Sequence, residues 1–184
     1  IDLLSLSGHQ FYGPKGVGAL LVAPGVELKP QLHGGGQEGG LRSGSVPLPL
    51  AVGLAEALER ALADAPQRAE RLAGLRDRLW QGLQPLEGVV LNGCLDQRLA
   101  HNLNVSVEGV DGARLHSALR RRLALSGGSA CSSSSGEPSH VLLALGRSRQ
   151  QAAASVRFGL GRANTAEQMD QALAWFTEQV QALR

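Results

Sequence analysis

The 184-residue sequence contains few aromatic residues and few lysines. Phe, Trp and Tyr make up 3% of it, and Lys15 and Lys29 are the only lysines among 18 basic residues. These 18 residues nearly balance 16 Asp and Glu and form no long blocks, which argues against a nucleic-acid partner. A hydrophobic content of 43% and a net charge of +2 argue equally against disorder.

Long hydrophobic runs and cysteines are also scarce. The longest apolar runs, such as residues 18–23, are too short to span a bilayer, and no secretory signal is recognisable. Two cysteines, Cys94 and Cys131, cannot form a disulfide framework, so we expect a reducing compartment, the cytoplasm. The sequence begins without methionine inside an apolar run, as a segment of a longer protein would.

The apolar pattern predicts a mixed α/β or α+β fold. Short apolar runs bounded by Gly, Pro or polar residues predict strands, and the first two are expected to form a hairpin with a buried first strand. These strands are expected at residues 2–7, 18–22, 89–91, 103–107, 123–125 and 156–160. Glycine is abundant, with 24 residues, and the segment 33–45 is too rich in glycine for regular structure.

Leucine spacing predicts the helices. Leucines at every fourth position indicate a helix over 50–62, and a second leucine stripe indicates another over 72–83, with Pro66 between them. A third helix is expected over 111–122 with Asp111 as its N-cap. The last begins at Thr165, where Thr-Ala-Glu-Gln matches a capping box.

Three segments contain candidate functional residues. The first, residues 7–16, combines Ser7 and His9 with a glycine-containing loop, whose free N–H groups can hold an anion such as phosphate. An ordinary polar hairpin loop is the competing interpretation.

The second segment, residues 127–136, places Cys131 among glycines and serines. Such residues provide no apolar side chains to bury a thiol, so we expect Cys131 to be accessible and capable of reaching a partner or substrate. A surface loop with an incidental cysteine remains the alternative. Cys94, beside Asn92 and Gly93, is interpreted as an incidental turn residue.

The third segment, residues 155–162, contains Arg157 inside an apolar strand. A guanidinium in such a place needs a partner, and a planar carboxylate matches it best. From the sequence, an internal Asp or Glu and the carboxylate of a substrate are equally good partners.

Together these segments resemble the cysteine desulfurases, over nearly all of the chain and in the same order. The resemblance is carried by short motifs: Ser-Gly-His-Gln at 7–10, Gly-Pro-Lys-Gly at 13–16, Gly-Gly-Gly-Gln-Glu at 34–38, Arg-Ser-Gly-Ser at 42–45, Asn-Leu-Asn-Val-Ser at 102–106, Gly-Ser-Ala-Cys-Ser at 128–132, Glu-Pro-Ser-His-Val-Leu at 137–142 and Ser-Val-Arg-Phe at 155–158. The match is to roughly the C-terminal half of such an enzyme. The long cysteine loop resembles the branch that serves iron–sulfur cluster assembly.

The resemblance implies the C-terminal part of a fold type I, aminotransferase-like enzyme that uses pyridoxal 5′-phosphate (PLP). Residues 1–48 would end the large PLP-binding domain, 49–84 would form connecting helices, and 85–184 would form the small α/β domain. The implied reaction removes sulfur from L-cysteine, giving L-alanine and a persulfide that passes to an acceptor such as an iron–sulfur scaffold protein. The implied assembly is a homodimer.

The resemblance also assigns roles to individual residues. Cys131 matches the nucleophile, and Arg157 matches the residue that binds the substrate carboxylate. Ser7 and His9 match groups that hold the cofactor phosphate. Ser45 stands where the family usually has threonine, contributed across the dimer to the neighbour's phosphate. No metal is implied.

Gln10 departs from the family pattern, because it occupies the position of the lysine that binds PLP covalently. A carboxamide nitrogen is not nucleophilic and cannot act as the lysine base. Lys15 matches a structural turn lysine and lies too far along the hairpin to substitute. We therefore expect this chain alone to be inactive. The alternatives are a non-catalytic relative that acts in dimerisation or sulfur relay, and a fragment without activity.

Overall fold

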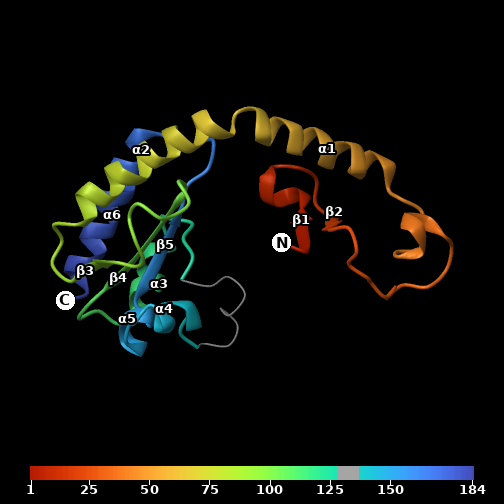
Figure 1. The fold of residues 1–184 in the computed structure, drawn as a ribbon. Coiled ribbons are helices and arrows are strands. Elements are labelled where there is room, and N and C mark those ends of the chain that lie inside the picture. Colours follow the sequence, from red (N-terminus) through yellow and green to blue (C-terminus); the bar gives the residue numbers. More distant parts are fainter. Residues whose placement is uncertain (128–136) are drawn as a thin grey trace. The chain divides into compact units, whose positions relative to one another are not determined.

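The computed structural model describes residues 1–127 and 137–184 of the chain (Figure 1). Cys131 and its neighbours from 128 to 136 lie outside the described residues. The described chain divides into two compact units, residues 1–65 and residues 66–184. The first contains the glycine-rich segments and one long helix, and the second contains the remaining helices and a three-stranded sheet.

The first unit begins with the predicted hairpin. Strands β1 (Leu3–Ser7) and β2 (Gly18–Val22) pair antiparallel, with Leu3 opposite Val22 and Ser7 opposite Gly18. A short 3₁₀ turn, η1 (Gly8–Phe11), follows β1 directly. The prediction of two strands joined by a Gly/Pro-punctuated loop is therefore confirmed.

The prediction that the first strand is buried is wrong. The side chains of Leu3, Leu4, Leu20 and Leu21 are 44–52% exposed. Each strand of the hairpin has only the other strand as its sheet neighbour. Apolar composition correctly predicted a strand, but burial depends on what packs over it, and the described residues place little over this hairpin.

Helix α1 (Leu48–Ala63) supports the loop that follows β1. Close contact is possible because small residues lie on both sides: a Cβ on Gly8 would meet the carbonyl oxygen of Pro14 at 2.8 Å, and one on Gly53 would meet the Pro14 ring at 2.8 Å. Between hairpin and helix, the glycine-rich segment contains only the 3₁₀ turn η2 (Gln37–Gly40). Glu38 has a positive φ of 53° there, within an otherwise irregular loop as expected.

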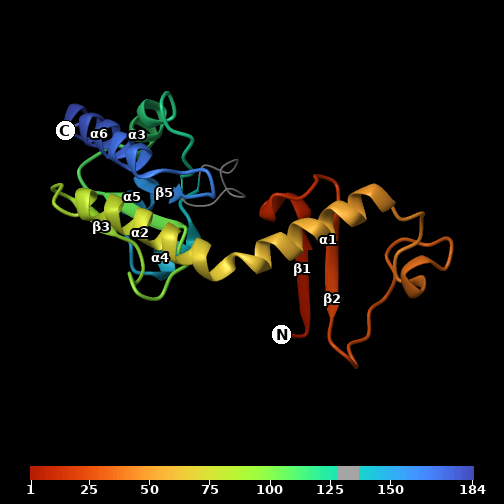
Figure 2. The same cartoon turned by 90° about the horizontal axis from the view of Figure 1, so that it is seen from above.

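The second unit is built around an antiparallel sheet in the order β3-β4-β5 (Figure 1; Figure 2 shows it from above). Val89 lies opposite Val107, and Asn104 lies opposite Arg157. The elements of this unit are α2 (Ala65–Leu83), β3 (Val89–Leu91), β4 (Asn102–Val107), α3 (Gly112–Leu119), α4 (His140–Ala144), α5 (Arg149–Ala153), β5 (Ser155–Gly159) and α6 (Ala166–Ala182).

The two faces of this sheet differ in chemistry because successive strand residues point to opposite sides. On β4, Leu103, Val105 and Val107 are buried in an apolar core, whereas Asn102, Asn104 and Ser106 alternate with them. Helices α2 and α6 lie together along one side of the sheet (Figure 1) and contribute Leu79 and Phe176 among others to the core. The opposite face of the sheet, which bears the polar side chains of β4, lines the hollow described below.

Helix α6 completes the core of the second unit, and a capping box begins this helix. The Phe176 ring, which is fully buried, meets Phe158 edge to face with centroids 5.7 Å apart. The Thr165 hydroxyl accepts a hydrogen bond from the Gln168 main-chain N–H, and Oε1 of Gln168 accepts one from the Thr165 main-chain N–H, so the predicted capping box is confirmed. The predicted N-cap of α3 is also confirmed, since Asp111 accepts from the Arg114 N–H at 2.8 Å.

Other local predictions differ from the structure. Residues 123–125 form no strand; beyond them Ser126 makes only an isolated bridge to Arg157. Helix α3 ends at Leu119, earlier than expected. The two five-residue helices α4 and α5 were not predicted, because each is too short to show a full apolar stripe. Among the described residues, no helix combines the length and hydrophobicity needed to cross a membrane.

Candidate functional site

The first group of predicted site residues lies where β1 enters η1. Ser7 Oγ is 3.1 Å from Nδ1 of His9, and the intervening Gly8 is buried. The Gly8 N–H donates to the Val17 carbonyl, and the Gly13 N–H donates to the Gly8 carbonyl, which fixes the loop. A hydroxyl and an imidazole thus lie side by side in a loop that its own main-chain bonds hold in place.

This arrangement fits PLP only in part. A phosphate group needs hydrogen-bond donors, and Ser7 and His9 can supply them. Covalent attachment of the cofactor aldehyde needs an amine, and Gln10, which is exposed in η1, has none. Lys15 is exposed in the loop that returns to β2, and Ser45 is exposed two residues before the Pro47 N-cap of α1. The donor set fits a phosphate, and the lysine position does not fit an imine.

Arg157 lies in the second unit, in the middle of β5 and partly buried. Its main chain is paired on one side with Asn104 and on the other with Ser126, whose carbonyl accepts the Arg157 N–H at 2.8 Å. Within residues 1–127 and 137–184, its guanidinium forms no hydrogen bond or ion pair with a carboxylate. Of the two partners left open by the sequence, the internal carboxylate is therefore not found in the described chain.

Arg157 lines a hollow of about 360 Å³ on the polar side of the sheet. The wall also includes Cys94 and Arg98 from the β3–β4 connection, Asn104 from β4 and Leu142 from α4. Cys94 is exposed at the rim. The sequence analysis assigned no function to this connection, whose Arg98 is a second positive charge at the hollow.

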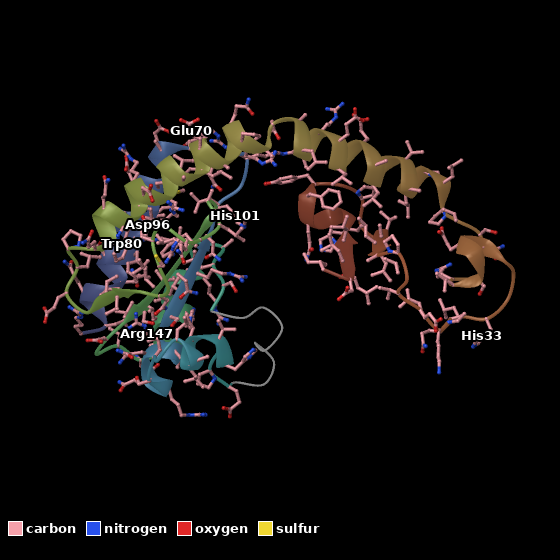
Figure 3. All side chains as sticks on the ribbon, viewed as in Figure 1. His33, Glu70, Trp80, Asp96, His101 and Arg147 are labelled. Carbon is pink, nitrogen blue, oxygen red and sulfur yellow. The ribbon has the colours of Figure 1, made fainter. Side chains whose placement is uncertain are left out.

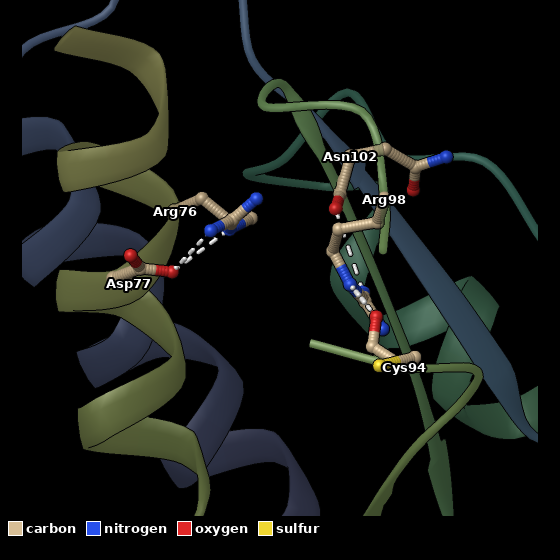
Figure 4. Close-up of polar contacts among 5 residues, drawn as sticks. All are labelled: Arg76, Asp77, Cys94, Arg98 and Asn102. Atoms are coloured by element: carbon tan, nitrogen blue, oxygen red, sulfur yellow. Dashed lines mark hydrogen bonds and ion pairs between the residues drawn. The ribbon is translucent and has the colours of Figure 1, made fainter. Parts of the chain in front are cut away.

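Arg98 is held by main-chain carbonyls rather than by carboxylates (Figure 4). Its guanidinium donates to the carbonyl oxygens of Cys94 at 2.7 Å and of Asn102 at 3.5 Å, both drawn in Figure 4. It also donates to the carbonyl oxygen of Asn92 at 2.9 Å. Burial lowers the pKa of Arg98, and the neighbouring charge of Arg76 lowers it further. Arg76 itself pairs with Asp77, with 2.7 Å between nitrogen and oxygen. The charge of Arg98 therefore adds to the positive character of the hollow that Arg157 lines.

A third arginine reaches the same region from the loop after α4. Arg147, labelled in Figure 3, donates through Nε to Oδ1 of Asn92 at 2.6 Å and through a terminal nitrogen to the Leu91 carbonyl at 2.6 Å. Asn92 is 5% exposed and also bonds to Asn104 and Ser106. The sequence offered no signal for this network, because it depends on side chains far apart in the chain.

The structure thus separates the predicted site residues into groups. Ser7, His9, Gln10 and Ser45 belong to the first unit, Arg157 belongs to the second, and Cys131 lies outside the described residues. Their predicted roles remain predictions. In the part of the chain that is described, no cluster of His, Cys, Asp and Glu has the makeup of a metal site.

Comparison with curated proteins gives close relatives. The sequence is 50% identical to the cysteine desulfurase IscS of Methylococcus capsulatus and 47% identical to the cysteine desulfurase IscS of a Shewanella species. In both cases the alignment covers 100% of this chain and 46% of the relative. The chain therefore spans about half the length of the curated relatives it matches.

Solved structures have the same fold. A NifS-like protein matches 100% of this chain and 47% of its own, with a TM-score of 0.86 and 35% identity. DndA from Streptomyces lividans matches 86% of this chain and 46% of its own, with a TM-score of 0.66 and 36% identity. The predicted fold class, part of an aminotransferase-like α/β enzyme, is thereby confirmed. The aminotransferase class-V family model matches residues 1–172, so the chain belongs to this PLP-dependent family.

Proposed function

We propose that this chain is the C-terminal part of a cysteine desulfurase-like protein, with the second unit recognising L-cysteine and handling its sulfur. The observation that carries the proposal is Arg157, a partly buried guanidinium that lines a hollow without a carboxylate partner in the described chain. A bidentate guanidinium is well suited to an amino-acid carboxylate. The relatedness to cysteine desulfurases supports L-cysteine as the amino acid.

The residues of this chain have separate tasks in the proposed reaction. Arg157 binds the substrate carboxylate and so directs the substrate sulfur. Cys131 supplies the thiolate that accepts this sulfur as a persulfide, which then passes to an acceptor protein of iron–sulfur cluster assembly. Ser7 and His9 donate hydrogen bonds to the cofactor phosphate, and Ser45 does so across a homodimer. PLP supplies the electron sink for breaking the carbon–sulfur bond when it is bound.

Gln10 limits this proposal, because it gives the cofactor no amine to bind. We therefore expect this chain, as it stands, to release no alanine from L-cysteine. The same observation favours a second function, a sulfur relay in the cytoplasm. In that relay the Cys131 thiolate attacks the outer sulfur of a donor persulfide, the donor S–S bond breaks, and the donor thiolate leaves.

Joining the chain to the N-terminal part of its Methylococcus capsulatus relative tests the enzymatic function. With Gln10→Lys, L-cysteine should yield alanine and a persulfide that an added thiol reductant releases as sulfide, whereas the unchanged chain in the same fusion should yield neither. Cys131→Ser on the Gln10→Lys background should abolish turnover, because a hydroxyl is a poor nucleophile towards sulfur. If Cys131→Ser released alanine at the parent rate, Cys131 would not be the residue that accepts the substrate sulfur. An inactive but well-folded Gln10→Lys fusion would favour the relay.

A further inference from the structure

Asn104 lies beside Arg157 on the polar face of the sheet. The two residues are direct partners in the antiparallel β4–β5 ladder, so their side chains leave the same face. Both line the hollow. The family motif at residues 102–106 includes Asn104, but the sequence gave this residue no task.

The hydrogen-bond network determines which end of the Asn104 amide faces its neighbour. Arg147 Nε can only donate, so the atom of Asn92 at 2.6 Å from it must be the acceptor Oδ1. The other end of the Asn92 amide is then the donor Nδ2, and it lies 2.6 Å from the Asn104 side chain. The facing atom of Asn104 must therefore be Oδ1.

Because Oδ1 of Asn104 accepts from Asn92, the Nδ2 group of Asn104 takes no part in the hydrogen-bond network that runs from Arg147 through Asn92. Among the described residues it has no hydrogen-bond partner. Nδ2 carries two N–H bonds, and a carboxylate oxygen accepts such bonds readily. Arg157 and Asn104, on neighbouring strands, thus line the hollow with a guanidinium and an amide donor that have no side-chain partner among the described residues, a combination that suits one carboxylate.

We infer that Asn104 is a second binding residue for the substrate carboxylate, acting together with Arg157, and that Arg147 and Asn92 are positioning residues that orient its amide. This inference rests on the proposed function, because it adds a contact to the same carboxylate. One carboxylate oxygen accepts from Arg157 and the other accepts from Arg157 and the Nδ2 of Asn104. These contacts then set the orientation of the carboxylate plane as well as neutralising its charge.

Replacement by aspartate separates binding from a purely structural role. In Asn104→Asp, one carboxylate oxygen can still accept from Nδ2 of Asn92, so the network is retained. The other oxygen faces Arg157 and forms an internal ion pair, which competes with the ligand. A structural role predicts that aspartate is tolerated better than alanine, whereas a binding role predicts that aspartate is at least as harmful.

Titration of the ¹⁵N-labelled chain with L-alanine tests the inference. NMR monitors the side-chain amide signals of Asn104 and the Nε–H signal of Arg157. L-Alanine has the carboxylate but no thiol to react with cysteines, and L-alaninamide is the control ligand without a carboxylate. We expect shifts with L-alanine only. Asn104→Ala should weaken L-alanine binding about tenfold, as for the loss of a hydrogen bond to a charged group. Asn104→Asp should weaken it at least as much.

Ser106→Ala is the matched control, because Ser106 bonds to the same Asn92 but is fully buried and outside the hollow. It should leave L-alanine affinity unchanged. If Arg157→Ala abolishes binding while Asn104→Asp keeps it, the role of Asn104 is wrong and the proposed function stands. If the unchanged chain shows no shift specific to L-alanine, or Arg157→Ala binds as the parent does, both are overturned.

Discussion

The two units of this chain bury their side chains very differently. All residues 1–65 are described, and Gly8 is the single buried one among them. In the second unit, Leu79 is 1% exposed and Phe176 is fully buried, within a core that α2, α3, α6 and the sheet share. The comparison shows that the loop between β1 and β2 can be locally well formed by main-chain hydrogen bonds while the unit that contains it has almost no core of its own.

The largest expected effect is on the core of the second unit. Phe176→Ala removes a buried ring that contacts Phe158, and such truncations cost about 3–5 kcal/mol. Leu99→Ala is the control, since Leu99 is 65% exposed in the same unit. Urea unfolding followed by tryptophan fluorescence measures both, because Trp80 and Trp175 both belong to this unit. Equal stability of the two variants would contradict the assigned core.

A smaller effect is expected at the start of α6. Thr165→Ala removes the side-chain oxygen that accepts the Gln168 N–H, and loss of such a cap costs about 1 kcal/mol. Thr165→Ser keeps the hydroxyl and should restore most of the stability. The same unfolding measurement applies, and a Ser variant as unstable as the Ala variant would argue against the cap.

Deletion of residues 1–65 compares the units directly. Because this removes no side chain buried in the second unit's core, the free energy of unfolding should change by less than about 1 kcal/mol. Pro66 would then begin α2, a position that suits proline. Loss of the fluorescence transition in residues 66–184 would show that the first unit contributes to this core after all.

His116 provides a pH-dependent comparison. Partial burial lowers its pKa below the ordinary 6.5, so the unfolded chain takes up a proton more readily than the folded one. Its contribution to stability is therefore present above pH 6.5 and is lost as the pH falls from there through its folded pKa. His116→Gln should flatten the fall in unfolding free energy between neutral and mildly acidic pH. An unchanged slope would contradict this assignment.

Most elements could be predicted from the sequence, because their signals are local. The stripe at Leu72, Leu75, Leu79 and Leu83 is a property of neighbouring turns of α2, and the capping box at Thr165 spans four residues. The exposure of Leu20 could not be predicted, because it depends on what packs over β2.

The candidate site was only partly predictable for the same reason. Arg157 is conspicuous as a charge within an apolar strand, so its need for a partner could be stated from the sequence. Asn104 and Arg147 have no such local signal. The β4–β5 register brings Asn104 beside Arg157, and Asn92, which lies 12 residues from Asn104 and 55 from Arg147, bonds to both of them.

The central proposal is that the chain cannot bind PLP covalently, because Gln10 occupies the position of the family's lysine. Incubating the chain with equimolar PLP, reducing with borohydride and measuring the intact mass tests this most directly. Lys15, Lys29 and the N-terminal α-amino group are the primary amines that can form an imine, so peptide mapping assigns any adduct to one of these three sites. The account predicts an unchanged mass, and a stoichiometric pyridoxyl adduct on Lys15 would contradict it.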